Sequence, residues 1–316
     1  SGDLFGYWQF YPTGEDSWGK VTVRGIGEVV ASHVEGIVVG ERLYGFFPMA
    51  SHVVMKPGEL SERGFTDAMP HRSELTGLYN YYARTQSEPA QLPALEDQRC
   101  IFFPLFMTGY VIADLLADNG WFGVQQVVIG SASSKTGFGT AAFVRAAGFE
   151  GTIVGLTSEQ NVAFSEALGC YDAVLPYGAV ESVVNTPSAY IDIAGDVEVR
   201  SRLHHSLKDN AARTLLVGAT HWDQFGQSVG GGPLPGSEPQ IFFAPAQIEK
   251  RDGEWGRGVM MGKAYAASIE LVTQLAPTLL MESHSGAEAC DAIWQALLDN
   301  QISGQRGIMV SLQSEP

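Results

Sequence analysis

The sequence predicts an α/β protein, in which a small curved β-unit is followed by a parallel sheet with helices on both faces. Two observations predict it. Residues 1–60 contain valine-rich runs that are interrupted by glycine. From about residue 104, strand-like and helix-like segments alternate. The chain has 316 residues, and since one domain commonly takes roughly 100–200 residues, two domains are expected.

The first segment is expected to be all-β. Residues 20–31 and 36–48 carry near-alternating apolar side chains interrupted by glycine, which is typical of strands that bend. Glycine at this spacing favours a small, tightly curved barrel. Residues 86–98 are rich in Pro, Glu and Gln and are expected to form a loop.

The segment from Pro104 to Ala117 has the apolar periodicity of a helix. Beyond it, short apolar runs predict strands, and amphipathic segments that end in or near glycine predict helices. The strands are expected at 126–130, 152–156, 173–175, 189–193, 214–217 and 240–243, and the helices at 139–148, 161–168, 198–207 and 262–275. A helix at 287–298 and a strand at 307–312 close the chain.

The composition excludes several classes of protein. With 19 Lys and Arg against 35 Asp and Glu, the net charge is −16, which disfavours binding to nucleic acid. We see no run of about 18 uninterrupted apolar residues and expect no membrane span. Cys100, Cys170 and Cys290 are too far apart for a disulfide framework or a structural zinc site, so we expect no metal and a cytoplasmic location.

The most informative segment is the turn in Val127–Gly139, which reads VVIGSASSKTGFG. A strand that runs through small residues into a helix leaves free N–H groups and the positive end of the helix dipole at the turn. An anion, usually a diphosphate, is stabilised there. Further hydroxyl or ammonium donors come from Ser131, Ser133, Ser134, Lys135 and Thr136.

This turn matches no standard fingerprint fully. The GxGxxG pattern of dinucleotide sites is absent, although Gly137 and Gly139 remain. The GxxxxGK[ST] pattern fails because, counting from Gly130, Lys135 and Thr136 stand where glycine and lysine are required. A purely structural strand–helix turn is the alternative interpretation.

The end of the next strand bears on the choice of cofactor. Domains that prefer NAD place Asp or Glu there, against the ribose hydroxyls. Here Thr157 and Ser158 occupy the position and leave room for a 2′-phosphate, so NADP(H) is favoured over NAD(H). Glu159, one residue further on, is the argument for NAD(H).

Motifs spread over nearly the whole chain carry a family resemblance. They are YWQFYP at 7–12, GERLYGFFP at 40–48, HR at 71–72 with YN at 79–80, SASSKT at 131–136, GLTS at 155–158, GATHW at 218–222 and FFAP at 242–245. The chain resembles the medium-chain dehydrogenase/reductase superfamily, in its zinc-independent, quinone-oxidoreductase-like branch, and most closely a bacterial family of unknown function within it.

The resemblance implies a domain organisation. A GroES-like barrel is expected from residues 1–103 and 277–316, and a Rossmann domain from residues 104–276. Members of the superfamily have more strand before the position of Ser1, so the first strands of the barrel are expected to be missing.

The resemblance also implies cofactor contacts. The superfamily's turn has an AxxGxxG-like pattern, and with Gly137 aligned its middle glycine falls at Ser134. Thr108 corresponds to a threonine near the nicotinamide, and Tyr177 to a tyrosine near the 2′-phosphate. Strand ends beside the nicotinamide are expected to carry Gly218, Ala219, Thr220 and Phe243.

Zinc-free members reduce quinones or activated C=C bonds with NADPH, so the resemblance implies this activity. Tyr79 and Tyr82 are the candidate proton donors, with Asn80 and the pair His71–Arg72 as polar anchors. Aromatic packing and a structural salt bridge are the simpler interpretations of these residues.

Two functions therefore stay open. The first is an NADPH-dependent reductase of a quinone, an enone or a related carbonyl compound. The second is a nucleotide-binding sensor or scaffold without turnover, which the altered glycine turn and the lack of an assured catalytic acid would suit. We expect a small-molecule substrate and, from the resemblance, a homodimer paired through the sheet edge.

Overall fold

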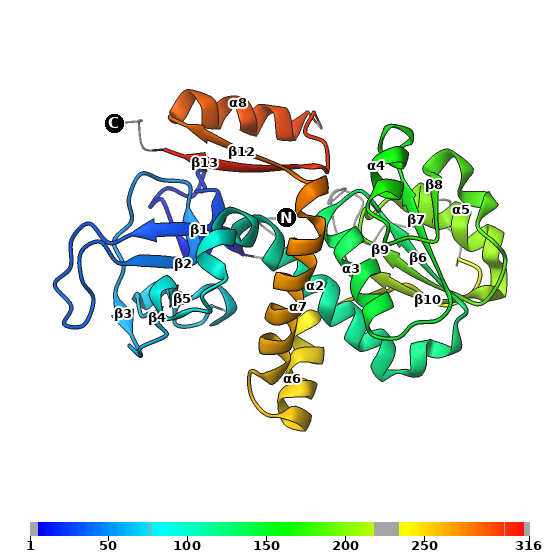
Figure 1. Cartoon of the computed structure of the whole chain (residues 1–316), viewed down its shortest axis with the longest axis horizontal. Helices are drawn as coiled ribbons and strands as arrows, with labels where there is room; N and C mark the ends of the chain where they lie inside the picture. Colours follow the sequence, from blue (N-terminus) through cyan, green and yellow to red (C-terminus); the bar gives the residue numbers. More distant parts are fainter. Residues whose placement is uncertain (1–5, 76, 218–233, 300, 313–316) are drawn as a thin grey trace. The chain divides into compact units, whose positions relative to one another are not determined.

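The computed structural model describes residues 6–75, 77–217, 234–299 and 301–312 (Figure 1). The chain divides into two compact units. Unit 1 comprises Ser1–Ile101, Met281–Ile302 and Gly307–Pro316, and unit 2 comprises Phe102–Leu280 and Ser303–Arg306. The sequence placed the corresponding boundaries after residues 103 and 276.

Unit 1 is built on an antiparallel five-stranded sheet of order β1-β2-β5-β4-β3. Its strands are β1 (Thr22–Glu28), β2 (Arg42–Pro48), β3 (Pro57–Gly58), β4 (Gly64–Asp67) and β5 (Tyr81–Arg84). The C-terminal part of the chain adds α8 (Ala287–Leu298) between β12 (Leu280–Ser285) and β13 (Arg306–Ser311), and these two strands pair with each other.

The interior of unit 1 contains a buried arginine. Arg72 is 1% exposed and lies in a short 3-10 turn, η2 (Pro70–Arg72). Its guanidinium donates from Nε and Nη2 to the Phe10 carbonyl oxygen at 3.1 and 2.9 Å. Its Nη1 donates to the Tyr82 hydroxyl at 2.9 Å and lies 3.4 Å from Oδ2 of Asp67. These contacts fasten η1 (Tyr7–Phe10) to the sheet, in agreement with a structural role for the arginine.

Unit 2 contains a six-stranded parallel sheet of order β11-β10-β9-β6-β7-β8 (Figure 1). The strands are β6 (Gln126–Gly130), β7 (Thr152–Thr157), β8 (Ala173–Pro176), β9 (Ser188–Asp192), β10 (Ala211–Leu216) and β11 (Gln240–Ile241). Counted along the chain, this order is 3-2-1-4-5-6, and the direction of winding reverses between β6 and β9. The predicted α/β class is thus confirmed.

Helices connect these strands and follow them. They are α2 (Glu96–Asp118), α3 (Lys135–Ala146), α4 (Val162–Ala167), α5 (Val197–Leu207), α6 (Ala244–Trp255) and α7 (Val259–Leu275). The central strands β6 and β9 are buried along their whole length, as continuous apolar runs indicate.

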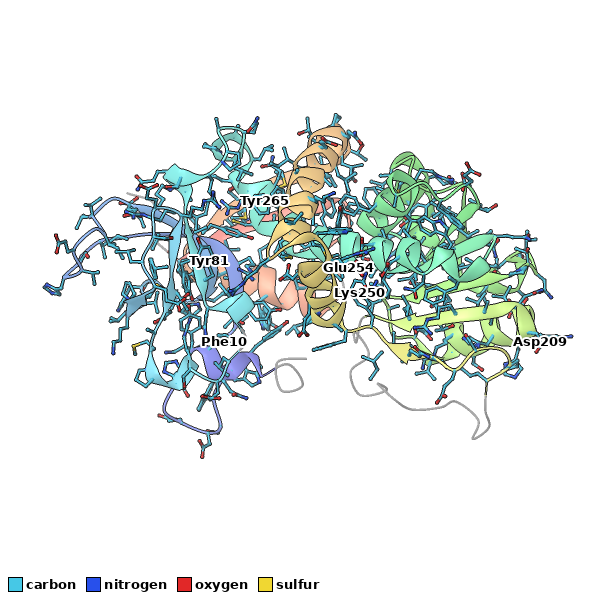
Figure 2. All side chains as sticks on the ribbon, turned by 90° about the horizontal axis from the view of Figure 1, so that it is seen from below. Phe10, Tyr81, Asp209, Lys250, Glu254 and Tyr265 are labelled. Atoms are coloured by element: carbon cyan, nitrogen blue, oxygen red, sulfur yellow. The ribbon has the colours of Figure 1, made fainter. Side chains whose placement is uncertain are left out.

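Two helical segments differ from the sequence prediction. Part of the expected loop at 86–98 is helical, because α2 begins at Glu96 and continues through Pro104. The polar helix α6 was not predicted. It carries the ion pair Lys250–Glu254 at 3.1 Å (Figure 2), and its Arg251 donates from Nε to Oδ2 of Asp114 on α2 at 2.8 Å.

The segment Leu92–Asp118 is long and apolar enough to cross a membrane, by length and composition alone. Half of its most apolar 18-residue window is buried within the structure, and core helices of proteins outside membranes have the same composition. The expectation that the chain has no membrane span stays a prediction.

The buried cation of unit 1 generates a stability prediction. Replacing Arg72 by Met removes every donor that it gives to Phe10 and leaves the Asp67 carboxylate without its counter-charge. Breaking a buried ion pair from one side costs roughly 3–5 kcal/mol. We expect the free energy of unfolding of Arg72→Met, measured in urea, to fall by an amount of that order. The exposed Arg63→Met is the control and should stay within about 0.5 kcal/mol of wild type. Equal free energies of unfolding for the two variants would contradict the structural role of Arg72.

Candidate functional site: the bend after β6

The bend between β6 and α3 lies at the point where the winding of the sheet reverses. Ser131 adopts a left-handed backbone conformation with φ of 56°, which turns the chain sharply at the end of β6. Ser134 caps α3, because its Oγ accepts from the Gly137 N–H at 3.1 Å. A Cβ on Gly137 would come within 2.4 Å of the Ser131 carbonyl oxygen. Only glycine lets the helix start so close to the strand.

The backbone N–H groups of this bend fall into two sets. The partnered N–H groups belong to Ser131, Ala132, Ser134 and Gly137. Among the residues that the structure describes, no acceptor faces the N–H groups of Ser133, Lys135 and Thr136. These three residues are half-buried, and their N–H groups lie at the N-terminal end of α3, where a helix leaves its first N–H groups unpaired by its own carbonyls. The strand–turn–helix geometry expected of an anion site is therefore present, and the binding of an anion there stays a prediction.

The side chains of the bend mostly support the bend itself. Ser134 donates its hydroxyl to the Ser131 carbonyl oxygen at 2.7 Å. Ser133 Oγ accepts from Oγ1 of Thr157 at 3.1 Å. Because Thr157 is 1% exposed, its hydroxyl ties β7 to the bend. Its expected role, to leave room for a 2′-phosphate, stays a prediction. Ser158 is half-buried, and its Oγ accepts from Nδ2 of Asn161 at 2.9 Å.

Lys135 differs most from the sequence expectation. Its Nζ donates to the carbonyl oxygens of Gly304 and Arg306 at 3.1 and 2.9 Å. A Cβ on Gly304 would lie 2.1 Å from the Ser133 carbonyl oxygen, so residues 303–306 pack directly against the bend. Burial lowers the pKa of Lys135 to about 8. The Lys135 ammonium, which the sequence suggested as a phosphate ligand, thus fastens residues 303–306 to the bend. The backbone N–H of Lys135 stays available.

Tyr177 supports the bend from the end of β8. Its hydroxyl accepts from the Ser131 N–H at 3.0 Å, and burial raises its pKa. A neutral phenol therefore holds the left-handed residue in place. The expected position beside a 2′-phosphate is not tested by this contact.

A second loop meets the same edge of the sheet, after β9. Asp192 is fully buried; its Oδ1 accepts from the Gly195 N–H at 2.8 Å and its Oδ2 from Nη1 of Arg200 at 2.6 Å. Burial raises the pKa of this carboxyl, and the bond from Arg200 opposes that shift. Sequence reasoning missed this pair. The signal was an aspartate at the end of a buried strand with an arginine eight residues later.

The remaining cofactor candidates are scattered. Thr108 is half-buried on α2, where its hydroxyl donates to the Pro104 carbonyl oxygen at 3.1 Å. Phe243 is 66% exposed and precedes α6. The candidates Gly218, Ala219 and Thr220 lie outside the described residues.

The three proposed catalytic side chains lie together in unit 1, but two are structural. Tyr82 is 0% exposed, and its hydroxyl lies 2.6 Å from that of Tyr11 and donates to the Phe46 carbonyl oxygen at 2.7 Å. Asn80 is also buried and donates from Nδ2 to the backbone carbonyl of Arg72 at 3.1 Å. Neither is accessible to a substrate, which corrects their expected roles.

Tyr79 remains half-exposed. Its ring packs against Phe10 and Phe46, and its hydroxyl lies 3.2 Å from that of Tyr7. Burial and the contact with Tyr79 raise the pKa of Tyr7, so the Tyr7 phenol is neutral in this pair.

Within the described ranges, no group of three or more His, Cys, Asp and Glu side chains is placed to hold a metal ion. The expectation of a metal-free protein stays a prediction.

The sheet order and the bend at its reversal point define a Rossmann-type fold. The chain belongs to the family described as "Protein of unknown function (DUF2855)", whose pattern matches residues 1–303. No curated protein matches the sequence.

Several solved structures resemble the chain at low identity. CurA from Vibrio vulnificus is 14% identical, with 92% of this chain and 79% of that chain covered and a TM-score of 0.51, which is a likeness of fold. CurA from the same organism in complex with NADPH is 13% identical, with 94% and 90% covered and a TM-score of 0.47. YhdH of E. coli K-12 with bound NADPH is 15% identical, with 95% and 94% covered and a TM-score of 0.48.

The buried ammonium of Lys135 generates a pH prediction. Its pKa of about 8 in the folded chain lies below the ordinary value of 10.5. Between these values the unfolded chain binds a proton that the folded chain lacks, so this group makes folding more favourable as the pH rises. Lys135→Met lacks this contribution. The stability of wild type relative to Lys135→Met, measured by urea unfolding, should therefore increase from pH 8 to pH 10. A difference that stays constant across this range would contradict the assignment.

Proposed function

We propose that this protein is an NADPH-dependent reductase that transfers a hydride to a quinone, an enone or a related carbonyl compound without zinc. The observation that carries the proposal is the bend after β6. There, three backbone N–H groups that have no partner among the described residues stand at the N-terminal end of a 12-residue helix, at the reversal point of a Rossmann-ordered sheet.

The residues of the bend fit a diphosphate. In this proposal the N–H groups of Ser133, Lys135 and Thr136 bind its oxygens, and the dipole of α3 stabilises its charge. The side chain of Lys135 acts indirectly, by fastening residues 303–306 against the bend. The hydroxyl of Thr136 is half-exposed in the first turn of α3 and adds a donor.

The preference for NADP(H) is part of the proposal. β7 ends in the buried Thr157, and no carboxylate stands at that position. Ser158 follows with a small side chain, which leaves room for a 2′-phosphate. Glu159 is exposed at the start of the next turn, η7 (Glu159–Asn161). Fold likeness to CurA, a protein crystallised with NADPH, agrees with this choice of cofactor.

When bound, reduced nicotinamide supplies a hydride to the electrophilic carbon of the acceptor. We assign Tyr79 as the group that gives a proton to the acceptor oxygen, since it alone of the three catalytic candidates is half-exposed. The neighbouring Tyr7 hydroxyl, 3.2 Å away, is positioned to orient that proton.

The same proposal covers the wider organisation. We place a GroES-like barrel in unit 1, and we expect a homodimer in the cytoplasm with a small-molecule substrate. This part rests on the family resemblance and on the acidic, cysteine-poor composition.

Thr136→Glu tests the diphosphate site. Glutamate in the first turn of a helix favours the helix, so the variant should fold, while its carboxylate repels a diphosphate at the bend. We expect NADPH affinity, measured by the fluorescence of the reduced cofactor, to fall by roughly tenfold or more, which is about 1.4 kcal/mol.

Thr273→Glu is the matched control, because Thr273 is exposed on α7. It should bind NADPH as wild type does. Equal affinities for the two variants, or no NADPH binding by wild type at millimolar concentration, would refute the site.

Tyr79→Phe tests the proton donor. Loss of a general acid typically lowers turnover by roughly 10²-fold or more, with NADPH affinity unchanged. Turnover is followed as the loss of NADPH absorbance over a panel of quinones and enones. Tyr81→Phe is the control, since Tyr81 is an exposed neighbour on β5 (Figure 2), and it should retain turnover. Wild-type turnover by Tyr79→Phe would exclude this role. NADPH binding without turnover of any acceptor would favour the sensor or scaffold.

A further inference from the structure

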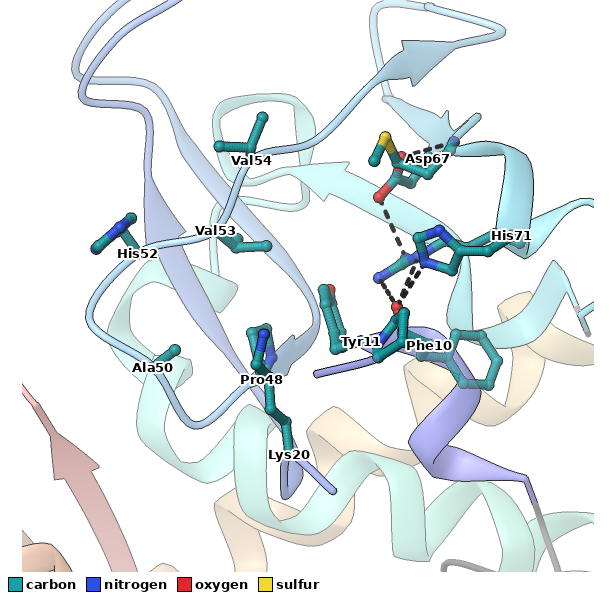
Figure 3. A pocket seen from close by; sticks show the side chains of 13 residues that line it. Phe10, Tyr11, Lys20, Pro48, Ala50, His52, Val53, Val54, Asp67 and His71 are labelled. Carbon is teal, nitrogen blue, oxygen red and sulfur yellow. Dashed lines mark hydrogen bonds and ion pairs between the residues drawn. The ribbon is translucent and has the colours of Figure 1, made fainter. Parts of the chain in front are cut away.

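Unit 1 contains a pocket that the nucleotide site does not use. Its volume is about 450 Å³, within the range of small-ligand sites. All of its lining residues belong to unit 1 (Figure 3). They come from the N-terminal segment, the end of β2 with the residues that follow it, and the turn after β4.

The lining is unusually basic for so acidic a chain. Lys20, His52, His71 and Arg72 line the pocket against a single carboxylate, that of Asp67, although the whole protein carries a net charge of −16. A ligand cavity with this balance favours a negatively charged occupant.

The single carboxylate is already neutralised. Asp67 is buried, and its Oδ1 accepts from the backbone N–H groups of Lys56 and Met69, both at 3.1 Å. Its Oδ2 forms the ion pair with Arg72. Its charge is therefore balanced within the wall and does not compensate the other basic groups.

The basic groups, in contrast, retain binding capacity. In the part of the chain that the structure describes, no acidic side chain pairs with Lys20 or His71. The Nε2 of His71 contacts the Phe10 carbonyl oxygen at 3.2 Å. The same oxygen accepts from Nε and Nη2 of Arg72. Arg72 is 1% exposed and its donors are used within the wall, by the Phe10 carbonyl oxygen, Asn80 and Tyr82, so Lys20 and His71, both exposed, are the basic groups open to a ligand.

The rest of the wall is apolar. Pro48 and Val53 form one side, and Tyr11 forms another (Figure 3). Lys20 and His71 reach toward the space between these sides from different elements (Figure 3). A fully solvated inorganic anion would leave these apolar surfaces uncovered, whereas an acid with a hydrocarbon body covers them.

We propose that this pocket is a binding site for a carboxylic acid with a small aryl or alkyl body. The carboxylate contacts the Lys20 ammonium and the imidazole of His71, and the hydrocarbon body packs against Pro48, Val53 and Tyr11. The site is complete within unit 1, and its occupation needs no nucleotide.

Isothermal titration of the full chain with phenylacetate tests this site, with phenylacetamide as the neutral probe of the same shape. We expect phenylacetate to bind and phenylacetamide to bind at least roughly tenfold more weakly, because the amide lacks the charge. Lys20→Met should weaken phenylacetate binding by roughly tenfold. Lys56→Met removes the same charge from an exposed side chain outside the lining and should leave the affinity unchanged.

Thr136→Glu, the variant of the nucleotide bend, should bind phenylacetate as wild type does, so that failure of one site is distinguished from failure of the other. Three results would overturn the proposal: no heat at millimolar phenylacetate, equal affinities for the acid and the amide, or equal affinities in Lys20→Met and Lys56→Met.

Discussion

The close approach of Gly137 to the Ser131 carbonyl oxygen is the constraint on which the candidate nucleotide site depends. A side chain at position 137 would collide at 2.4 Å, so α3 begins next to the end of β6 only because that residue is glycine. Tyr177 and Thr157 then use their hydroxyls to hold the bend from β8 and β7. The backbone N–H groups of Ser133, Lys135 and Thr136, together with the positive end of the α3 dipole, remain as the part of the bend able to bind an anion.

This arrangement changes what the side chains of the bend do. A lysine in a turn beside a helix N-terminus suggests a phosphate ligand. The Lys135 ammonium instead donates hydrogen bonds to two carbonyl oxygens of residues 303–306. The segment that it fastens is 169 residues away in sequence and lies against Ser133. The bend is thus shaped by residues 303–306 as well as by β7 and β8, and positive charge at the site comes from the backbone rather than from a side-chain cation.

Much of the fold was predictable because buried parallel strands are continuous apolar runs; Val127, Val128 and Ile129 of β6 are all 0% exposed. Helix α6 was not, since it packs through Arg251 and other polar groups that match acids on α2, without an apolar period. The candidate site residues also differ in how far the sequence could predict them. The bend has a local signature, whereas the burial of Tyr82 depends on partners at distant positions, which no local pattern reveals.

The most direct test is a crystal structure of the protein with NADPH. The account predicts diphosphate oxygens within hydrogen-bonding distance of the N–H groups of Ser133, Lys135 and Thr136, with the Lys135 ammonium still on the carbonyls of Gly304 and Arg306. A diphosphate bound elsewhere, or one held by the Lys135 side chain after residues 303–306 have left the bend, would contradict it.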